Sequence, residues 1–345
     1  MFIFSQVSSA AQEGARFGAT HPREIITNAD DGAHSYPSGR VPGGAHWDAP
    51  CTVVDQARAR VVLLDQRAVN VEVSYDDGSS PKDPWSDGWI PGQDVSGVVL
   101  REAANGLGPS RGTRVLALTD QFGWAEQVAV PTHRLVPLPD NVTFSQAATL
   151  PVAGLTALRC LRLGGSLVGR RVLVTGAAGG VGSLAIQIAA GSGALVTGVA
   201  RDPDRAAGLH ALGAHEIVHS IDEATGHYAL ILESAGGSSL SQALKRIEPN
   251  GTVVVYGNSS GEPSPISFQD FRSAQNARIQ SFFYFTSAPE EQFAPDLALL
   301  VSMVSAGQLR PLIGTERSWT ELAAVAESLR GRQIMGKAIF RTGNV

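Results

Sequence analysis

The sequence predicts an α/β protein with two parts, a β-rich unit and a doubly wound parallel sheet. Three observations lead to this prediction. The chain has 345 residues, which is more than one hydrophobic core normally holds. Short β-branched runs separated by turn residues occur from about residue 60, and apolar strands alternate with helical periodicity from residue 171. Strands that alternate with helices imply parallel pairing.

The first half of the chain predicts the β-rich unit. Residues 1 to about 55 are rich in Gly, Pro, Ser, His and Asp and show little periodicity. After them, runs such as "RVVLL", "VSGVVL" and "TRVLALT" are separated by turn stretches such as "DDGSSPKDP" and "GPSRG". This pattern indicates a small barrel or folded sheet. Next we expect a helix capped near Thr143 or Ser145, and a second helix after Pro151.

From residue 171 strands and helices alternate regularly. "RVLVTG" leads to "GSLAIQIAAGSG", "LVTGVA" to "PDRAAGLHALGA", and "YALILESAG" to "LSQALKRIEPNG", with further strands at "EIV" and "TVVVYGN" and a segment ending in "IQSFFYF". This order is typical of a sheet with helices on both faces. The tail adds a helix in "WTELAAVAESLRG" and a strand in "GKAIF", which we expect to return to the first part.

The stretch "GAAGGVG", residues 176 to 182, lies directly after a strand and before a helix. Residues without bulky side chains there allow a tight turn and let a dinucleotide diphosphate approach the amides at the helix start. The residues expected to make this contact are Ala178, Gly179, Gly180, Val181 and Gly182. The alternative is a glycine turn used for backbone reasons alone, which the alternating elements that follow argue against.

The end of the next strand bears on the choice of dinucleotide. NAD-binding sheets place an acid there, whereas NADP-binding sheets replace it and add a cation for the 2′-phosphate. The expected position is Ala200, followed by Arg201 and Arg205, which favours NADPH over NADH. Asp202 argues for NADH, and both arginines could instead be solvated charges at a helix start.

Composition excludes several classes of function. The net charge is −5 and there is no basic block, so neither nucleic acid nor an anionic membrane is an expected partner. The two cysteines, Cys51 and Cys160, form neither a disulfide framework nor a thiolate zinc cluster. No signal peptide or membrane span is apparent. We therefore expect a soluble cytoplasmic protein that acts on a small molecule.

The chain from about residue 60 resembles the medium-chain dehydrogenase/reductase superfamily, in its zinc-independent quinone oxidoreductase and enoyl reductase branch. The resemblance rests on "RAVNVEVSY", "PGQDVSGVV", "LPDNVTFSQAATLPVAGLTAL", "GAAGGVG", "HALGAHEIV" and "GKAIF", in that order. It implies a GroES-like catalytic domain over residues 1–138 and 313–345, a Rossmann domain over residues 139–312, and an active site between them. It also implies a homodimer formed through the strand that matches "SFFYF", for which the alternative is an aromatic run within the core.

The resemblance further implies an active site without metal. Zinc-dependent relatives carry a cysteine and a histidine where this chain has Asn70 and Gln93, neither of which is a usual zinc ligand. In the quinone oxidoreductase branch an asparagine and a tyrosine five residues later line the nicotinamide side, and Asn70 and Tyr75 match that spacing. Tyr75 would donate a hydrogen bond or a proton to the substrate. Its alternative is a solvated tyrosine at the end of a strand.

Further cofactor contacts are implied by the same resemblance. They are Thr156 in "TLPVAGLTA", Asn258 and Ser259 in "GNSSG", and Lys337 in "GKAIF". The alternative for Thr156 is an ordinary buried threonine in a helix, and for Asn258 and Ser259 a turn without a ligand. The alternative for Lys337 is a solvated lysine at the start of a strand.

The function that these features predict is NADPH-dependent transfer of hydride to a quinone or a carbonyl-conjugated double bond. Two alternatives stay open. One is a biosynthetic tailoring reaction on the same fold, such as iminium reduction or cyclisation. The other is an NADPH-binding protein without turnover. Residues 1 to about 55 do not match the usual opening of the family. In relatives this opening forms part of one wall of the active-site cleft, so the resemblance does not predict how this chain recognises its substrate.

Overall fold

The computed structural model describes residues 92–104, 106–120, 123–125, 127–284 and 293–341, together with the backbone of residues 70–74. Tyr75 and residues 1 to 55 lie outside the described residues, so the predictions made for them are not judged by the fold.

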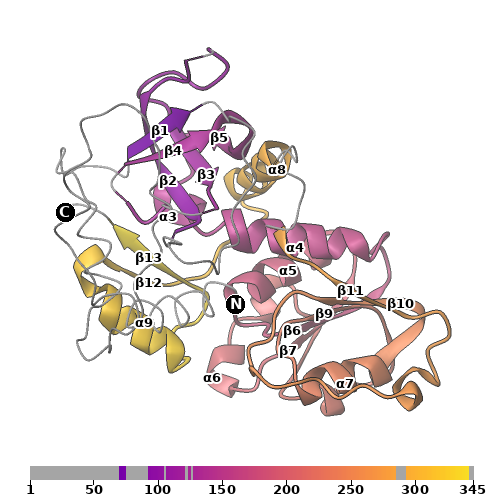
Figure 1. Ribbon diagram of the computed structural model, residues 1–345. Coiled ribbons are helices and arrows are strands. Elements are labelled where there is room, and N and C mark those ends of the chain that lie inside the picture. Colours follow the sequence, from indigo (N-terminus) through magenta and orange to yellow (C-terminus); the bar gives the residue numbers. More distant parts are fainter. Residues whose placement is uncertain are drawn as a thin grey trace, which may run out of the picture.

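The first sheet holds five strands in the order β4-β1-β2-β3-β5 (Figure 1). These strands are β1 Asn70–Ser74, β2 Asp94–Arg101, β3 Arg114–Leu118, β4 Gln127–Pro131 and β5 Leu135–Pro137. β1 pairs in parallel with β2 and β4, whereas β2–β3 and β3–β5 are antiparallel. Buried side chains such as Val95, Val115 and Val130 give this sheet a core of its own. The predicted β-rich unit is therefore confirmed.

The second sheet holds six parallel strands in the order β11-β10-β9-β6-β7-β8. They are β6 Arg171–Thr175, β7 Leu195–Val199, β8 Glu216–Val218, β9 Tyr228–Glu233, β10 Ile247–Val255 and β11 Arg278–Ser281. From the centre of the sheet, β6, β7 and β8 follow one another toward one edge, and β9, β10 and β11 toward the opposite edge. This is the doubly wound order that the alternating sequence predicts, with its switch point between β6 and β9.

Helices cover both faces of the six-stranded sheet. The described helices are α3 Phe144–Ala147, α4 Pro151–Leu163, α5 Gly180–Gly191, α6 Pro203–Ala206, α7 Ser238–Arg246, α8 Ala294–Ser305 and α9 Leu322–Arg330. Short 3-10 turns are η2 Thr132–Arg134, η3 His210–Leu212, η4 Ile221–Glu223, η5 Phe268–Phe271 and η7 Trp319–Glu321. The predicted cap at Thr143 is confirmed as a capping box with Gln146, and Pro151 begins α4.

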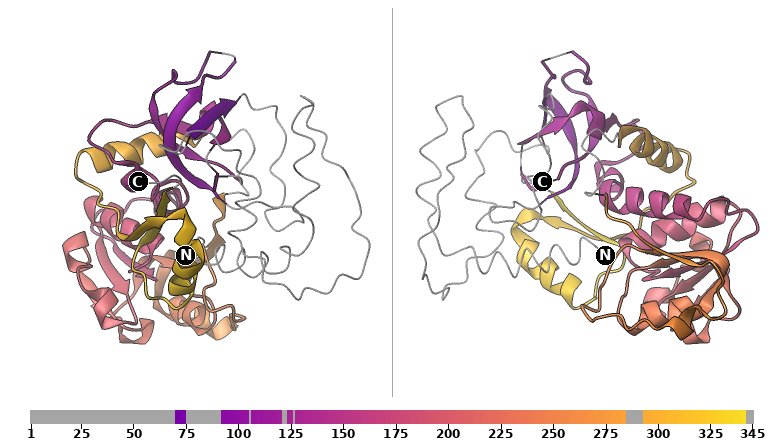
Figure 2. Two further views of the ribbon diagram at one scale, coloured as in Figure 1. Left: turned by 90° about the vertical axis from the view of Figure 1, so that its left-hand side faces the viewer. Right: turned by 45° about the vertical axis from the view of Figure 1, so that its right-hand side comes forward.

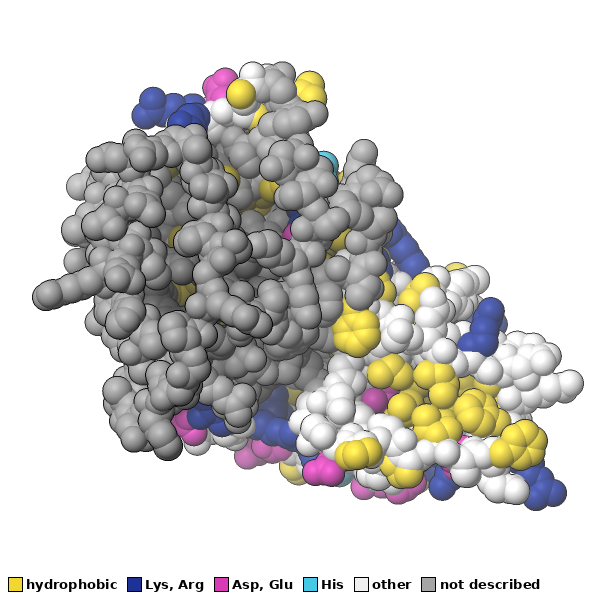
Figure 3. All heavy atoms as spheres, viewed as in Figure 1, with side chains coloured by type: hydrophobic (Ala, Val, Ile, Leu, Met, Phe, Trp, Pro, Cys, Tyr) yellow, Lys and Arg dark blue, Asp and Glu magenta, His cyan; other side chains and the backbone are white. Residues whose placement is uncertain are grey.

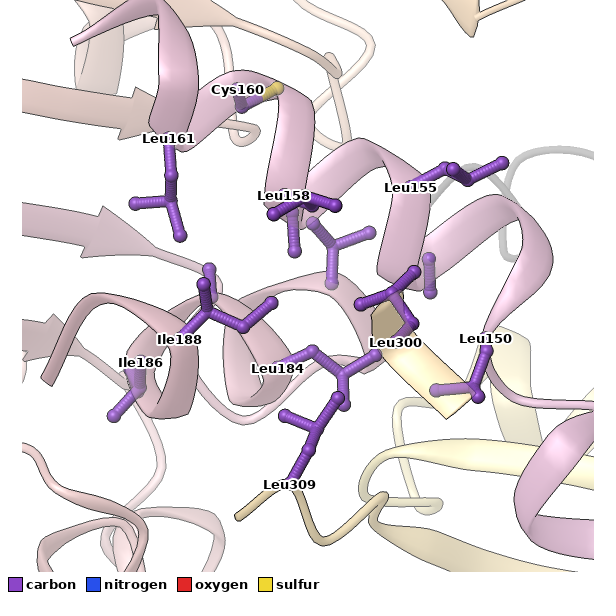
Figure 4. Packing of buried hydrophobic residues seen from close by; sticks show 14 of the residues in the cluster. Leu150, Leu155, Leu158, Cys160, Leu161, Leu184, Ile186, Ile188, Leu300 and Leu309 are labelled. Atoms are coloured by element: carbon purple, nitrogen blue, oxygen red, sulfur yellow. The ribbon is translucent and has the colours of Figure 1, made fainter. Parts of the chain in front are cut away.

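Successive side chains along the strands point to opposite faces of the sheet and pack against different helices. Val172 and Val174 of β6 pack in one core with α4 and α5, whereas Leu173 packs in another with Leu240 and Leu244 of α7. This is the period of two expected for strands buried on both faces. Figure 4 shows leucines of α4 facing Leu184 and Ile188 of α5, with Leu300 of α8 beside them. The larger core thus binds α4, α5 and α8 to the same side of the sheet.

The tail lies below the first sheet and beside the six-stranded sheet in Figure 1 and in the right-hand view of Figure 2. It consists of β12 Ile313–Ser318, helix α9, and β13 Lys337–Arg341, with β12 and β13 paired in parallel. Trp319 packs edge to face on Trp124 of the first part, with ring centroids 5.6 Å apart. The tail therefore contacts the first part by side chains, while the domain limits at residues 138 and 313 stay a prediction.

The fold differs from expectation after β7. The stretch "PDRAAGLHALGA" predicts one helix, but the structure has only the four-residue α6 and the turn η3. Gly208 between them has φ +85°, a left-handed conformation that interrupts a helix. Within the described residues, no helix is long and apolar enough to cross a membrane.

Candidate active site

The loops that follow β6, β7, β9 and β10 all lie at one edge of the six-stranded sheet. Parallel strands place their carboxyl ends at the same edge, and the strand order reverses between β6 and β9. In open α/β sheets, ligands bind at this edge, beside the reversal. The glycine loop of residues 176–179 lies here, directly after β6.

The glycine loop turns sharply into α5. Gly176 has φ +62°, and the amide of Gly179 donates to the carbonyl of Gly176 at 2.9 Å. Helix α5 begins at Gly180, and its N-cap Gly179 has no side chain to cap the first amides. Because a helix offers no internal acceptors for its first N–H groups, the amides at the start of α5 are available to an anion.

Gly182 lets helix α5 lie close to the loop that precedes it. A Cβ atom at this position would be 2.3 Å from the carbonyl oxygen of Gly176 and 2.8 Å from the Cα of Ala177. Both are backbone atoms, which cannot move aside as a flexible side chain would. Close packing of the helix on this loop therefore requires glycine at position 182.

A buried carboxylate, which the sequence reasoning missed, shapes the next loop. Glu233 ends β9 and is fully buried. It accepts hydrogen bonds from the amides of Ala235 and Gly236, both at 3.0 Å, and from Ser239 Oγ at 2.7 Å. Thr175 Oγ1, at the end of β6, donates to it at 3.2 Å. These bonds occupy the carboxylate and fix the loop after β9 beside the glycine loop. An acidic residue at the end of a strand was the only signal in the sequence.

The end of β7 carries the residues predicted to choose the dinucleotide. Ala200 is buried, and Arg201 is exposed directly after it. The carboxylate of Asp202 accepts from the amide of Asp204 at 2.9 Å and so caps α6. Arg205 lies with one Nη 3.4 Å from the carbonyl oxygen of Ile334. Its Nε is buried without a hydrogen-bond partner among the described residues.

Lys337 joins the tail to the first sheet and to the glycine helix. Its Nζ lies 2.8 Å from Asp94 Oδ2, at the start of β2, and the side chain is only 5% exposed. Its methylene groups lie against Gly180, where a Cβ would be 2.8 Å from the lysine Cδ. Asp94 Oδ1 accepts from the amide of Val152 at the start of α4, at 2.8 Å. The ammonium is thus paired with a carboxylate of the protein itself.

Other predicted residues fall in different settings. Thr156 is buried within α4, while Asn258 and Ser259 are exposed after β10, where the amide of Ser259 donates to Ser234 O at 3.0 Å. Asn70 begins β1 and is opposite Val98 and Gln127.

Gln93 is buried directly before β2, and its Nε2 donates to the hydroxyl of Tyr284. Burial raises the pKa of the Tyr284 phenol well above its ordinary value, and the carboxylates of Asp120 and Asp94 raise it further. The phenol therefore stays protonated and able to hydrogen-bond. No group of three or more His, Cys, Asp or Glu side chains in the described ranges is placed to hold a metal ion.

Comparison with known proteins supplies the family. A family model described as "Zinc-binding dehydrogenase" matches residues 180–302. The quinone oxidoreductase of Homo sapiens is 29% identical over 265 residues, which cover 73% of this chain and 79% of the human protein. The crystal structure of a quinone oxidoreductase from Pseudomonas syringae superposes with a TM-score of 0.62 at 27% identity, covering 72% of this chain and 81% of that one. The chain belongs to the medium-chain dehydrogenase/reductase superfamily.

Within this superfamily the chain falls in the quinone oxidoreductase-like branch. The YhdH oxidoreductase of Salmonella enterica, solved in complex with NADP, is 25% identical with a TM-score of 0.62, covering 74% of this chain and 83% of that one. The predicted fold class, a GroES-like sheet with a Rossmann sheet, is confirmed by these matches and by the two sheets described above. As a member of the superfamily, the protein is an oxidoreductase that depends on a nicotinamide nucleotide.

The steric role of Gly182 predicts a contrast between two positions in α5. Gly182→Ala should lower the free energy of unfolding by about 1–3 kcal/mol, the usual effect of overpacking, because the new methyl group meets backbone. Gly191→Ala is the matched control, since nothing lies within 4 Å of a Cβ there. It should be neutral or stabilise by up to about 1 kcal/mol. Urea denaturation followed by tryptophan fluorescence measures both, and equal midpoints would contradict the packing described here.

Proposed function

We propose that this protein is an NADPH-dependent reductase that transfers hydride to a quinone or a carbonyl-conjugated double bond without a metal ion. The observation that carries the proposal is the uncapped start of α5 behind a loop without side-chain bulk, at the switch point of the six-stranded sheet. Gly182 lets α5 pack closely against this turn, because a Cβ there would overlap the backbone of Gly176 and Ala177. Such a cradle fits a dinucleotide diphosphate.

In this proposal the main chain of Ala178 to Gly182 holds the diphosphate. The amides at the start of α5 donate to the phosphate oxygens, and the helix dipole favours the negative charge. Thr156, Asn258 and Ser259 are proposed as further contacts of the nucleotide. Lys337 is proposed to support the nucleotide through its packing against Gly180, because its ammonium is paired with Asp94.

NADPH is proposed over NADH from the charges that follow β7. Arg201 is exposed at the strand end, where it can reach a 2′-phosphate. Arg205 is close to it along α6, and its buried Nε has no hydrogen-bond partner in the part of the chain that the structure describes. Asp202, which would favour a free ribose, is occupied as the cap of α6. The Salmonella enterica relative, solved in complex with NADP, supports the same choice.

The chemistry requires donors rather than a Lewis acid. The bound nucleotide would supply the hydride, and charge would develop on the carbonyl oxygen of the substrate. Asn70 and Tyr75 are proposed to donate hydrogen bonds to that oxygen, and Tyr75 to deliver the proton. Asn70 and Gln93 stand where zinc-dependent relatives carry ligands, and neither amide is a usual zinc ligand. This supports catalysis without zinc.

A homodimer is proposed through the open edge of the six-stranded sheet. All four residues of β11 are exposed, and its outer edge has no partner strand in the described chain. An unpaired edge is a template for a strand of a second copy. Hydrophobic side chains gather over this side of the molecule in Figure 3, and Ile266, Phe268 and Ile279 are exposed nearby. A cytoplasmic location is proposed with it, because the free thiol of Cys160 suits a reducing compartment.

The overall proposal is tested by turnover with and without metal. The purified protein should oxidise NADPH in the presence of a 1,4-benzoquinone or a cyclic enone, at an unchanged rate after dialysis against a chelator. Loss of reduced-nicotinamide absorbance measures the rate, and elemental analysis of the dialysed sample verifies that zinc is gone. Oxidation that disappears with the metal would overturn catalysis without zinc. Nucleotide binding with no turnover on either acceptor would favour a binding protein or a tailoring reaction.

Tyr75 is tested by removal of its hydroxyl. Tyr75→Phe should lower kcat by about 10²–10⁴-fold, the usual contribution of a general acid, with the affinity for NADPH unchanged. Single-turnover kinetics with a cyclic enone measure the chemical step directly. A full rate in this variant would exclude Tyr75 as the proton donor.

The choice of nucleotide is tested with two arginines at opposite edges of the sheet. Arg201→Ala should weaken NADPH binding by about tenfold, the loss of one exposed charge-assisted contact, and leave NADH binding unchanged. Arg170→Ala is the control, since Arg170 precedes β6 at the amino edge and pairs with Glu248. Fluorescence titration with both nucleotides gives the ratio of dissociation constants. Equal loss for NADPH and NADH in Arg201→Ala would remove the role given to this residue.

A further inference from the structure

Gln93 lies where the first sheet meets the start of the glycine helix. It directly precedes Asp94, whose carboxylate binds the ammonium of Lys337 at 2.8 Å. The methylene groups of that lysine lie against Gly180, the first residue of α5. A chain of direct contacts therefore places Gln93 close to the end of α5 that we propose for the diphosphate.

Tyr284, which follows the last strand of the six-stranded sheet, holds the side chain of Gln93. This tyrosine comes three residues after the end of β11, at the same edge of the sheet as the glycine loop. It is buried and packs edge to face on Phe293, with ring centroids 6.3 Å apart. Because Gln93 Nε2 donates to its hydroxyl, the amide is fixed at the junction of the two sheets, beyond the carboxyl ends of the strands.

The orientation of this amide follows from a second neighbour. Gln93 Nε2 also lies 3.4 Å from the carbonyl oxygen of Asp120. A carbonyl oxygen only accepts hydrogen bonds, so the amide must turn its NH₂ group toward Asp120. The opposite rotamer would place two carbonyl oxygens against each other. The oxygen Oε1 consequently points away from both neighbours.

Gln93 Oε1 is a buried acceptor without a donor. The residue is only 4% exposed, and no donor in the described ranges reaches this oxygen. An unpaired buried polar group is unfavourable, and folded proteins normally satisfy such groups with protein, water or ligand. The position of this oxygen, at the edge of the sheet where nucleotide and substrate would meet, favours the ligand.

We propose that Gln93 Oε1 accepts a hydrogen bond from the substrate, and that the site selects quinones or enones that carry a hydroxyl or N–H group besides their carbonyl. The proposal rests on the proposed reductase function. The reacting carbonyl cannot fill this role, because it is itself an acceptor and would be served by Asn70 and Tyr75. The hydrogen-bond donor must therefore be a second polar group of the substrate. Tyr284 is a positioning residue that aims the amide.

The experiment compares cyclohex-2-enone with ring-hydroxylated cyclohex-2-enones in the full-length protein. We expect kcat/KM to be about tenfold higher for the best hydroxylated enone than for the parent, as one added hydrogen bond gives. Gln93→Met keeps the length of the side chain but has no amide, and its ratio should fall to about one. A wild-type ratio near one, as a bound water on Oε1 would give, overturns the proposal. So does a ratio that survives in Gln93→Met.

Tyr284→Phe tests the positioning role with the acceptor group still present. It should lower the preference for the hydroxylated enone through KM, with kcat on the parent enone unchanged. Thermal denaturation of both variants verifies that they fold. A Tyr284→Phe variant with the wild-type ratio of KM values would exclude Tyr284 from the role.

A binding measurement separates this inference from the reductase proposal. Isothermal titration with cyclohexanone and 3-hydroxycyclohexanone, which cannot be reduced at a double bond, is carried out in the presence of NADP⁺. We expect the hydroxylated ketone to bind about tenfold more tightly, and only when Gln93 is present. If neither quinones nor enones are reduced, the reductase proposal fails. The ratio of the two dissociation constants still tests the role of Gln93 in that case. Equal binding of the two ketones rejects the role of Gln93 whatever the turnover.

Discussion

The ion pair of Lys337 with Asp94 is the contact on which the arrangement of the site depends. Both side chains are largely buried, and removal of two charges from water is unfavourable unless further polar contacts satisfy them. Here the second carboxylate oxygen takes the amide of Val152, and the lysine methylenes pack on Gly180. The pair therefore connects the tail, β2, α4 and α5 at one point, which makes the glycine helix part of a rigid junction rather than a separate nucleotide-binding module.

Two loops of the site are shaped by opposite means. The turn after β6 has no side chain that caps the first amides of α5, so these amides stay available to an anion. The loop after β9 has its amides at Ala235 and Gly236 bound by the buried carboxylate of Glu233. Because this carboxylate is saturated by donors of the protein itself, it does not compete for the amides of the neighbouring loop. Among the described residues at this edge, the start of α5 is therefore the turn that we propose for the diphosphate.

Local patterns predicted the fold and the glycine loop because their causes are local. The strand period, the cap at Thr143 and the turn at Gly176 depend on residues close in sequence. The contacts of Gln93 with Tyr284 and of Lys337 with Asp94 join residues far apart along the chain. No spacing rule in one sequence announces such pairs. The helix expected after β7 was wrong for a local reason, since the break at Gly208 was underweighted.

The late position of the tail in the chain has a consequence for biosynthesis. The amide of Gly336 donates to the carbonyl of Ala178 in the glycine loop, and Lys337 lies on Gly180. A ribosome completes the six strands of the parallel sheet well before it reaches these residues. During translation the growing polypeptide therefore has its turn after β6 without the support of β13. The supported form of the turn that we propose for the nucleotide therefore exists only after β13 has been synthesised and has emerged from the ribosome.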